Sequence, residues 1–245
     1  MGTIEKINVK QNPLVLLRVL KTIGLVLTLG VSMSACGSGS ENWKEDVLLH
    51  DGSKIIVERS QIRGGRHEIG QGKPIKEHSI TFTPVGASKP ITWKSEFSED
   101  IGHSNFGLLA VGIVNGTPYV AAFPIGCLAY NKWGRPNPPY KFFKYINMQW
   151  KQIPLVEFPV EIKQPNVVID TYGHADVDHA VKTGFISTDI INKLNSTLTQ
   201  EEFKSIVRTP IKNVSSDCGE LIFYKGAWVG PGDSIGKQMM DRKIK

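Results

Sequence analysis

The stretch that decides the fold is FGLLAVGIVNGTPYVAAF, residues 106–123. An almost wholly apolar run, 106–114, leads into Asn115-Gly116, and a second apolar run, 119–123, follows. Asn-Gly between two apolar runs is a strong signal for a two-residue β-hairpin turn, because both residues tolerate a positive φ. Runs without polar alternation are typical of strands that are covered on both faces. We therefore expect a buried β-hairpin here.

Weaker strand signals flank this hairpin. Asp51-Gly52 separates apolar-rich residues 43–49 from 55–57, which favours another hairpin. Apolar and polar residues alternate at 80–83 and 91–97, as in strands with one buried face. Further strands are expected at 142–145, 150–153, 221–224 and 228–229. Hairpin following hairpin predicts an antiparallel meander.

Helical signals come late in the chain. Ser187 is placed to cap a helix with apolar residues at 190, 191 and 194, and residues 199–202 resemble a capping box. We predict a mainly β (α+β) fold, an antiparallel β-hairpin meander with a short helical segment near the C-terminus, about residues 186–209. The strand order stays open, because hairpins can close as a sandwich, a barrel or an open sheet.

Residues 1–35 have the features of a secretory signal peptide. Four basic residues precede an apolar run, 23–31, which is shorter than the roughly 20 residues that span a bilayer. Met33-Ser34-Ala35 lies directly before Cys36, an order that resembles the bacterial lipobox with Met33 in place of the preferred Leu. The resemblance implies a lipoprotein with diacylglycerol on the Cys36 thiol and an acyl group such as palmitate on its amine. The alternative is an ordinary signal peptide that ends near a cysteine.

This interpretation divides the chain into a signal peptide (1–35), a Gly/Ser tether (36–42), a single β-rich domain (43–236) and a polar tail (237–245). The lipoprotein resemblance, with Gly37 after the cysteine, implies a protein anchored to a membrane of the cell envelope, the outer membrane of a Gram-negative bacterium, beside the periplasm. Of the 29 basic and 23 acidic residues, four and one lie in the signal peptide. The remainder is only mildly basic, so we do not expect nucleic acid as a partner.

Two cysteines, Cys127 and Cys218, remain once Cys36 is assigned to the lipid. In an oxidising compartment such a pair favours a disulfide, which closes a loop of about 90 residues. Two separate buried thiols are the alternative, because the sequence does not give the distance between them.

The segment YNKWGRPNPPY, residues 130–140, is the densest unusual stretch. Aromatic rings, an arginine and stiff prolines suit a surface that recognises a sugar ring, a peptide or a protein partner. The competing interpretation is structural, with the rings folded back over the sheet. A basic cluster around Gly64-Gly65 is a second candidate, for anions, against a solvated loop that protects an edge strand. The candidate binding residues are Tyr130, Trp133, Arg135, Tyr140, Arg59, Arg63 and Arg66.

Motifs for catalysis are weak. His174-Ala-Asp176-Val-Asp178-His179 resembles the metal motif of metallo-β-lactamase-like hydrolases, but no further His follows, and a solvated polar loop is the simpler interpretation. Residues 98–102 partly resemble the Asp-box turn of sialidase-type propellers, in a single copy where that fold needs repeats. Motifs for a serine nucleophile, a phosphate loop or a dinucleotide are missing. We assign no catalytic residue and expect neither a metal nor a cofactor.

Five segments resemble a set of uncharacterised proteobacterial lipoproteins: residues 41–43, 58–61, 65–71, 91–96 and, as the most specific, 130–140. The resemblance covers about 36–168 and implies an envelope location without an activity. We therefore expect a lipid-anchored, non-enzymatic module that binds an envelope protein or a glycan. The alternative is a periplasm-facing hydrolase of envelope polymer or sugar, which needs a cleft that holds two or more of His103, His174, His179, Asp100 and Asp178.

Overall fold

The computed structural model describes residues 40–65, 67, 69–70, 72–170, 175–212, 214 and 218–243. Over these residues the chain is mainly β, with antiparallel sheets and few helices, which confirms the fold class expected from the sequence. Residues 1–39, with the expected signal peptide, Cys36 and most of the tether, lie outside the described residues, as do Arg66 and His174. No described helix is long and apolar enough to cross a membrane.

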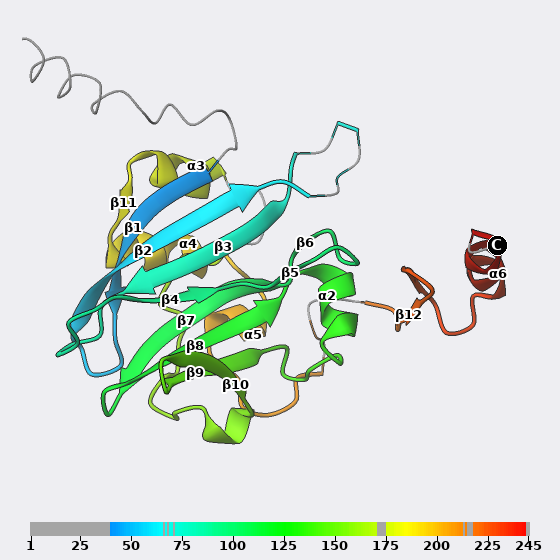
Figure 1. Cartoon of the computed structure of the whole chain (residues 1–245). Helices are drawn as coiled ribbons and strands as arrows, with labels where there is room; N and C mark the ends of the chain where they lie inside the picture. The colour runs from blue at the N-terminus through cyan, green and yellow to red at the C-terminus, as the bar shows by residue number, and fades with distance from the viewer. Residues whose placement is uncertain are drawn as a thin grey trace, which may run out of the picture. The chain divides into compact units, whose positions relative to one another are not determined.

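The strands and helices follow one another along the chain as labelled in Figure 1. The strands are β1 (Ser40–Leu48), β2 (Lys54–Arg63), β3 (Ile75–Phe82), β4 (Ile91–Lys94), β5 (Phe97–Ser98), β6 (His103–Ser104), β7 (Phe106–Val114), β8 (Thr117–Pro124), β9 (Lys141–Ile146), β10 (Gln149–Ile153), β11 (Phe185–Ile186), β12 (Ile222–Tyr224) and β13 (Ala227–Val229). The helices are α2 (Gly126–Lys132), η1 (Leu155–Glu157), α3 (Ala175–Lys182), α4 (Thr188–Ser196), α5 (Glu201–Lys204) and α6 (Ser234–Lys243).

Two sheets carry most of the described strands. The first has the order β11-β1-β2-β3-β4 and the second the order β10-β9-β8-β7, so β1 to β4 and β7 to β10 each form a meander of sequential hairpins, and β11 joins the first sheet from later in the chain (Figure 1). Neighbouring strands in the two sheets are antiparallel, except that β11 runs parallel to β1. The turn between β7 and β8 has positive φ at both Asn115 and Gly116, as the Asn-Gly pair predicts.

The inner faces of the two sheets share one hydrophobic core. Val47, Val57 and Ile80 from the first sheet are buried with Phe106 and Val120 from the second. Burial of this apolar surface is the main force that holds the two sheets together. The sheets therefore pack as two layers around a common core, which resolves the strand order that the sequence left open.

The central hairpin is buried on both faces, as its continuous apolar sequence predicts. Its second face carries Leu109, Ala121 and Phe123, which pack against residues of the C-terminal segment such as Phe203. A β-bulge between Leu108 and Ala110 shifts the register by one residue, so the inward and outward sets change parity along β7. The hairpin thus lies between the first sheet and the chain that follows β10.

Several segments differ from the expectations. β1 already begins at Ser40, so the last three residues of the expected tether pair with β2. The aromatic–proline segment begins inside a helix, α2, and most of the expected polar loop at 174–179 forms helix α3, whose Ala180 packs against Ile186. The expected polar tail begins within α6. Each helix forms where packing against a neighbour adds to a weak local preference.

Candidate functional site

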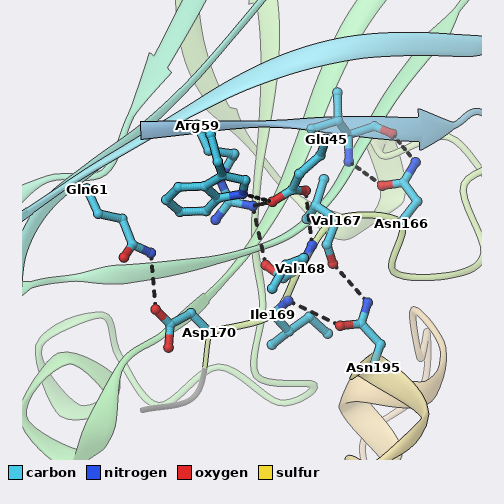
Figure 2. A network of polar contacts seen from close by, with 11 residues as sticks. Glu45, Arg59, Gln61, Asn166, Val167, Val168, Ile169, Asp170 and Asn195 are labelled. Atoms are coloured by element: carbon cyan, nitrogen blue, oxygen red, sulfur yellow. Dashed lines mark hydrogen bonds and ion pairs between the residues drawn. The ribbon is translucent and has the colours of Figure 1, made fainter. Parts of the chain in front are cut away.

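Arg59 is not on the surface, because its side chain lies on the inner face of the first sheet. Only 2% of that side chain is exposed, against 0% for its partner Glu45. Nη1 of Arg59 donates to Glu45 Oε1 at 2.9 Å (Figure 2). The indole Nε1 of Trp43 donates to the same oxygen at 2.7 Å. A buried charge persists only when it is paired and hydrogen-bonded. Arg59 therefore offers no guanidinium face to an external anion.

This buried pair fastens a segment without regular secondary structure, residues 166–170, to the first sheet. Val168 N donates to Glu45 Oε2 at 3.1 Å, and Arg59 Nη1 donates to Val168 O at 3.3 Å. From the opposite side, Asn195 of α4 donates to Val167 O at 2.8 Å and accepts from Ile169 N at 3.2 Å (Figure 2). Side chains thus satisfy backbone groups that in a strand would pair with a neighbouring strand.

Two further amides and one arginine extend the same network. Asn166 donates to Leu48 O and to Val111 O, so it links β1 of the first sheet to β7 of the second. Gln61 donates to Asp170 at 3.1 Å (Figure 2). Arg63 is half-buried and donates through Nε and Nη2 to both carboxylate oxygens of Glu41, each at 3.2 Å. The two described arginines of the expected anion cluster are thus already paired with carboxylates.

Two tyrosines of the aromatic–proline segment are buried. The hydroxyl of Tyr140, the residue before β9, shares its hydrogen between the carbonyl oxygens of Glu202 in α5 and Ser205 after it, and it accepts from Val207 N. Burial raises the pKa of this hydroxyl above its ordinary value. Tyr130 is 6% exposed and its ring lies below the guanidinium of Arg135. Both tyrosines are placed for structure.

Trp133 is partly buried and contributes mainly to packing. Its ring lies 4.7 Å from the ring of Phe106, measured between centroids, and it packs against the core between the sheets. Its indole Nε1 is buried without a hydrogen-bond partner among the described residues. The Nζ atom of Lys141 lies 5.7 Å from the ring centroid, and burial lowers the pKa of this lysine. Of the four aromatic–proline candidates, Arg135 is the exposed one.

The segment nevertheless has a second role, since it fixes the chain that leads to β12. Cys127 of α2 and Cys218 form a disulfide with a Cα–Cα distance of 5.2 Å. Asn131 donates to Gly219 O at 3.1 Å and accepts from Leu221 N at 2.8 Å. Arg135 also donates to Gly219 O. One covalent bond and three hydrogen bonds therefore hold residues 218–221 against α2 and the loop that follows it.

An open cleft lies where the β12–β13 hairpin meets α2 and the β5–β6 turn. Its volume is about 640 Å³, and it is lined by Glu99, Asp100, Lys132, Phe223, Gly226 and Trp228. The rings of Phe223 and Trp228 lie 5.4 Å apart, and 52% of Phe223 is exposed. Large aromatic side chains left open to solvent beside polar groups are characteristic of recognition sites.

Polar contacts across the cleft fix its walls. Lys132 Nζ donates to Asp100 Oδ1 at 2.8 Å, and the indole Nε1 of Trp228 donates to Oδ2 of the same carboxylate at 3.3 Å. Burial alone would raise the pKa of Asp100, but hydrogen bonding to cationic Lys132 outweighs it and holds the pKa below its ordinary value. Asp100 is therefore an ionised wall group at neutral pH. Glu99 is exposed and makes no polar contact with another described residue.

The residues expected of a hydrolase are not brought together in the described part of the chain. Asp100 lies in the cleft with Lys132 as its partner, and His103 Nδ1 is bonded to Ser104 O. Asp178 and His179 lie on α3, and Asp178 is 3.9 Å from Arg63. Among the described residues no group of three or more His, Cys, Asp or Glu side chains is arranged to hold a metal ion.

Sequence reasoning named none of the cleft residues as a binding candidate, including Lys132, Phe223 and Trp228. These three are separated from one another by up to 96 positions, which is the distance from 132 to 228 in the chain. The expected disulfide was the one available signal, because it predicts that the residues beside Cys127 and Cys218 lie close together. Comparisons with protein families, with characterised proteins and with solved structures find no match to this chain.

Proposed function

We propose that this chain is a lipid-anchored protein of the bacterial cell envelope whose β-rich domain binds a ligand in the cleft between α2, the β5–β6 turn and the β12–β13 hairpin. The observation that carries the proposal is the aromatic pair of exposed Phe223 and partly buried Trp228 beside the Asp100–Lys132 ion pair. Ligand sites in proteins combine apolar and aromatic walls with a few placed polar groups, in volumes of roughly 300–1,000 Å³. The cleft meets this description.

The ligand class that suits these groups best is a glycan. The flat apolar face of a sugar ring stacks on an aromatic ring, and its hydroxyls exchange hydrogen bonds with carboxylates and a lysine. Glu99 and Asp100 supply acceptors and Lys132 supplies donors along one wall. The frame is rigid, because the disulfide and the Asn131 contacts tie the hairpin to α2. A rigid frame lowers the entropy cost of binding.

The envelope location rests on the sequence before the described residues. A basic segment, a short apolar run and Ser34-Ala35-Cys36 support processing at Cys36 and acylation there. Two or more acyl chains hold a protein on a bilayer where one chain holds it only reversibly. Growth with radiolabelled palmitate tests this part. Label should enter the wild-type protein and not the Cys36→Ser variant, and an unlabelled wild-type protein would refute the anchor.

Binding is tested with purified peptidoglycan disaccharide-peptides and with lipopolysaccharide core oligosaccharide as probes. We expect a saturable calorimetric signal from at least one probe, weakened at least tenfold by Phe223→Ala. The matched control is Phe185→Ala on β11, because Phe185 is 48% exposed and Phe223 is 52% exposed. Equal affinity of the two variants would refute the cleft as the site. Failure of every probe to bind would refute a glycan as the ligand.

A further inference from the structure

Helix α6 is built with one face against the β12–β13 hairpin. Asp233 caps its N-terminus, since Oδ1 accepts from Gly236 N at 2.8 Å. A side chain at position 236 would crowd this cap, because a Cβ there would lie 2.4 Å from the Asp233 carboxylate. At the other end, Asp241 accepts from the Tyr224 hydroxyl at 3.0 Å and from Lys225 Nζ at 2.5 Å. The hairpin thus holds one face of the helix.

The opposite face has no partner among the described residues. Ile235 is 71% exposed and Met239 is 65% exposed, one helical turn apart. Gln238, Arg242 and Lys243 are exposed at the helical spacings that place them on the same side. The one acidic residue within α6, Asp241, is turned to the hairpin. The exposed face therefore combines two large apolar side chains with two cations and no acidic residue.

We propose that this exposed face of α6, residues 235, 238, 239, 242 and 243, docks on an anionic phospholipid surface. Apolar side chains enter the boundary between headgroups and acyl chains, and flanking lysine and arginine side chains attract anionic headgroups. The face is too small for a stable protein interface, which takes about 20–30 residues a side. A helix of 10 residues is only about 15 Å long. A bilayer surface does not require a complementary shape from its partner, so a short helix is enough for docking on it.

The proposal goes beyond the ligand cleft and requires neither that cleft nor the acyl anchor. It predicts a second membrane contact, at the opposite end of the chain from Cys36. Because part of the attraction is electrostatic, binding must fall as salt is added. It must also fall when anionic lipid is replaced by zwitterionic lipid of the same chain length.

A fluorescent label on the helix face tests the contact directly. The full chain is made with Cys36→Ser and Gln238→Cys, and the new thiol is labelled with an environment-sensitive fluorophore, with the Cys127–Cys218 disulfide left intact. Vesicles of phosphatidylglycerol and phosphatidylcholine should shift the emission to the blue, whereas phosphatidylcholine vesicles alone should not. A label that does not shift while the chain sediments with the anionic vesicles overturns the proposal. So does a shift that requires an added protein.

Matched variants separate the face from the rest of the chain. Ile235→Asp with Met239→Asp should abolish the shift, whereas Val85→Asp with Val156→Asp, which are 78% and 88% exposed outside α6, should leave it unchanged. All variants share residues 1–39, so a difference between them reports on α6. An unchanged shift in the α6 pair, or an equal loss in both pairs, contradicts the docking.

The charges are tested in the same way. Arg242→Gln with Lys243→Gln should weaken binding to the anionic vesicles by roughly 30-fold, from about 1 kcal/mol for each of the two cations at the surface. The control, Lys73→Gln with Lys89→Gln, removes the same charge from two other exposed positions and should leave the affinity within about twofold. Equal weakening by both pairs overturns the assignment to α6, because net charge alone would then explain it.

Discussion

Replacing Glu45 with Gln should destabilise the domain far more than the same change at an exposed glutamate of this sheet. Glu45 is fully buried and accepts hydrogen bonds from Arg59, Trp43 and the Val168 backbone N–H. The substitution keeps the shape of the side chain but leaves Arg59 as an unpaired buried cation. It also turns an amide N–H toward Val168 N–H or toward the cation, so one donor loses its acceptor.

The expected loss is about 3–5 kcal/mol, the usual cost of removing one partner from a buried ion pair. A domain with a free energy of unfolding of about 5–15 kcal/mol loses much of its stability by such a change. A matched control lies on the same two strands. Lys44 and Glu58 are paired in the β1–β2 register and form an ion pair of 3.2 Å, with 56% and 61% of their side chains exposed. Glu58→Gln should cost less than about 0.5 kcal/mol.

Urea unfolding followed by tryptophan fluorescence measures both effects, because Trp43 belongs to the network. A double-mutant cycle for Glu45 and Arg59 should give a coupling energy of about 2–3 kcal/mol, and the cycle for Lys44 and Glu58 about 0.5 kcal/mol or less. If Glu45→Gln and Glu58→Gln lower the unfolding midpoint equally, the reasoning from burial is refuted.

Three further predictions concern other parts of the fold. Burial lowers the pKa of His78 to about 4, below the value of about 6.5 in an unfolded chain. The unfolded chain therefore binds the proton more readily than the folded chain. The stability that neutral His78 contributes is full above about pH 6.5 and is lost as the pH falls toward 4. His78→Gln should flatten this part of the stability–pH curve, and an identical slope in both proteins contradicts the assignment. Cys127→Ser should lower the free energy of unfolding by up to roughly 4–5 kcal/mol, because the disulfide closes a loop of about 90 residues in the unfolded chain. An unchanged urea midpoint would show that the disulfide adds no stability. Asn195→Ala should lower the free energy of unfolding by about 2 kcal/mol, because it leaves buried backbone groups of residues 167 and 169 unpaired. The control Asn192→Ala, exposed on the same helix, should leave the melting temperature nearly unchanged. Equal melting temperatures of the two variants would contradict this role of Asn195.

The hairpins were predictable because each is specified by a local pattern. Asn115-Gly116 has the positive φ angles that the turn needs, and the apolar runs on each side of it are buried on both faces. The buried ion pair was also within reach of this reasoning. Trp43, Glu45 and Val47 alternate with exposed residues, so period two places the carboxylate on the inner face. Arg59 on β2 has the same parity as Val57, so the pattern places it inward as well.

The helices were harder to predict because local signals are weak there. α2 has Ile125 at its N-cap position, without a side-chain hydrogen bond, and has 7 residues. Short helices are marginal by themselves and gain their stability from packing, here of Ala129 and Tyr130 in the buried interior. The cleft was beyond local reasoning for a different reason. Asp100 and Trp228 meet only because long-range contacts, among them the disulfide, bring them together.

The most direct test of the proposed binding site is a nitrogen-15 NMR titration of the tryptophan side chains with the peptidoglycan and core-oligosaccharide probes. The chain has five tryptophans, so their indole N–H signals can be assigned by substitution. Trp228 lines the cleft, whereas Trp43 is 3% exposed within the buried network and serves as the internal reference. We predict a saturable shift of the Trp228 signal with no change at Trp43. A probe that binds while the Trp228 signal stays in place would contradict the account.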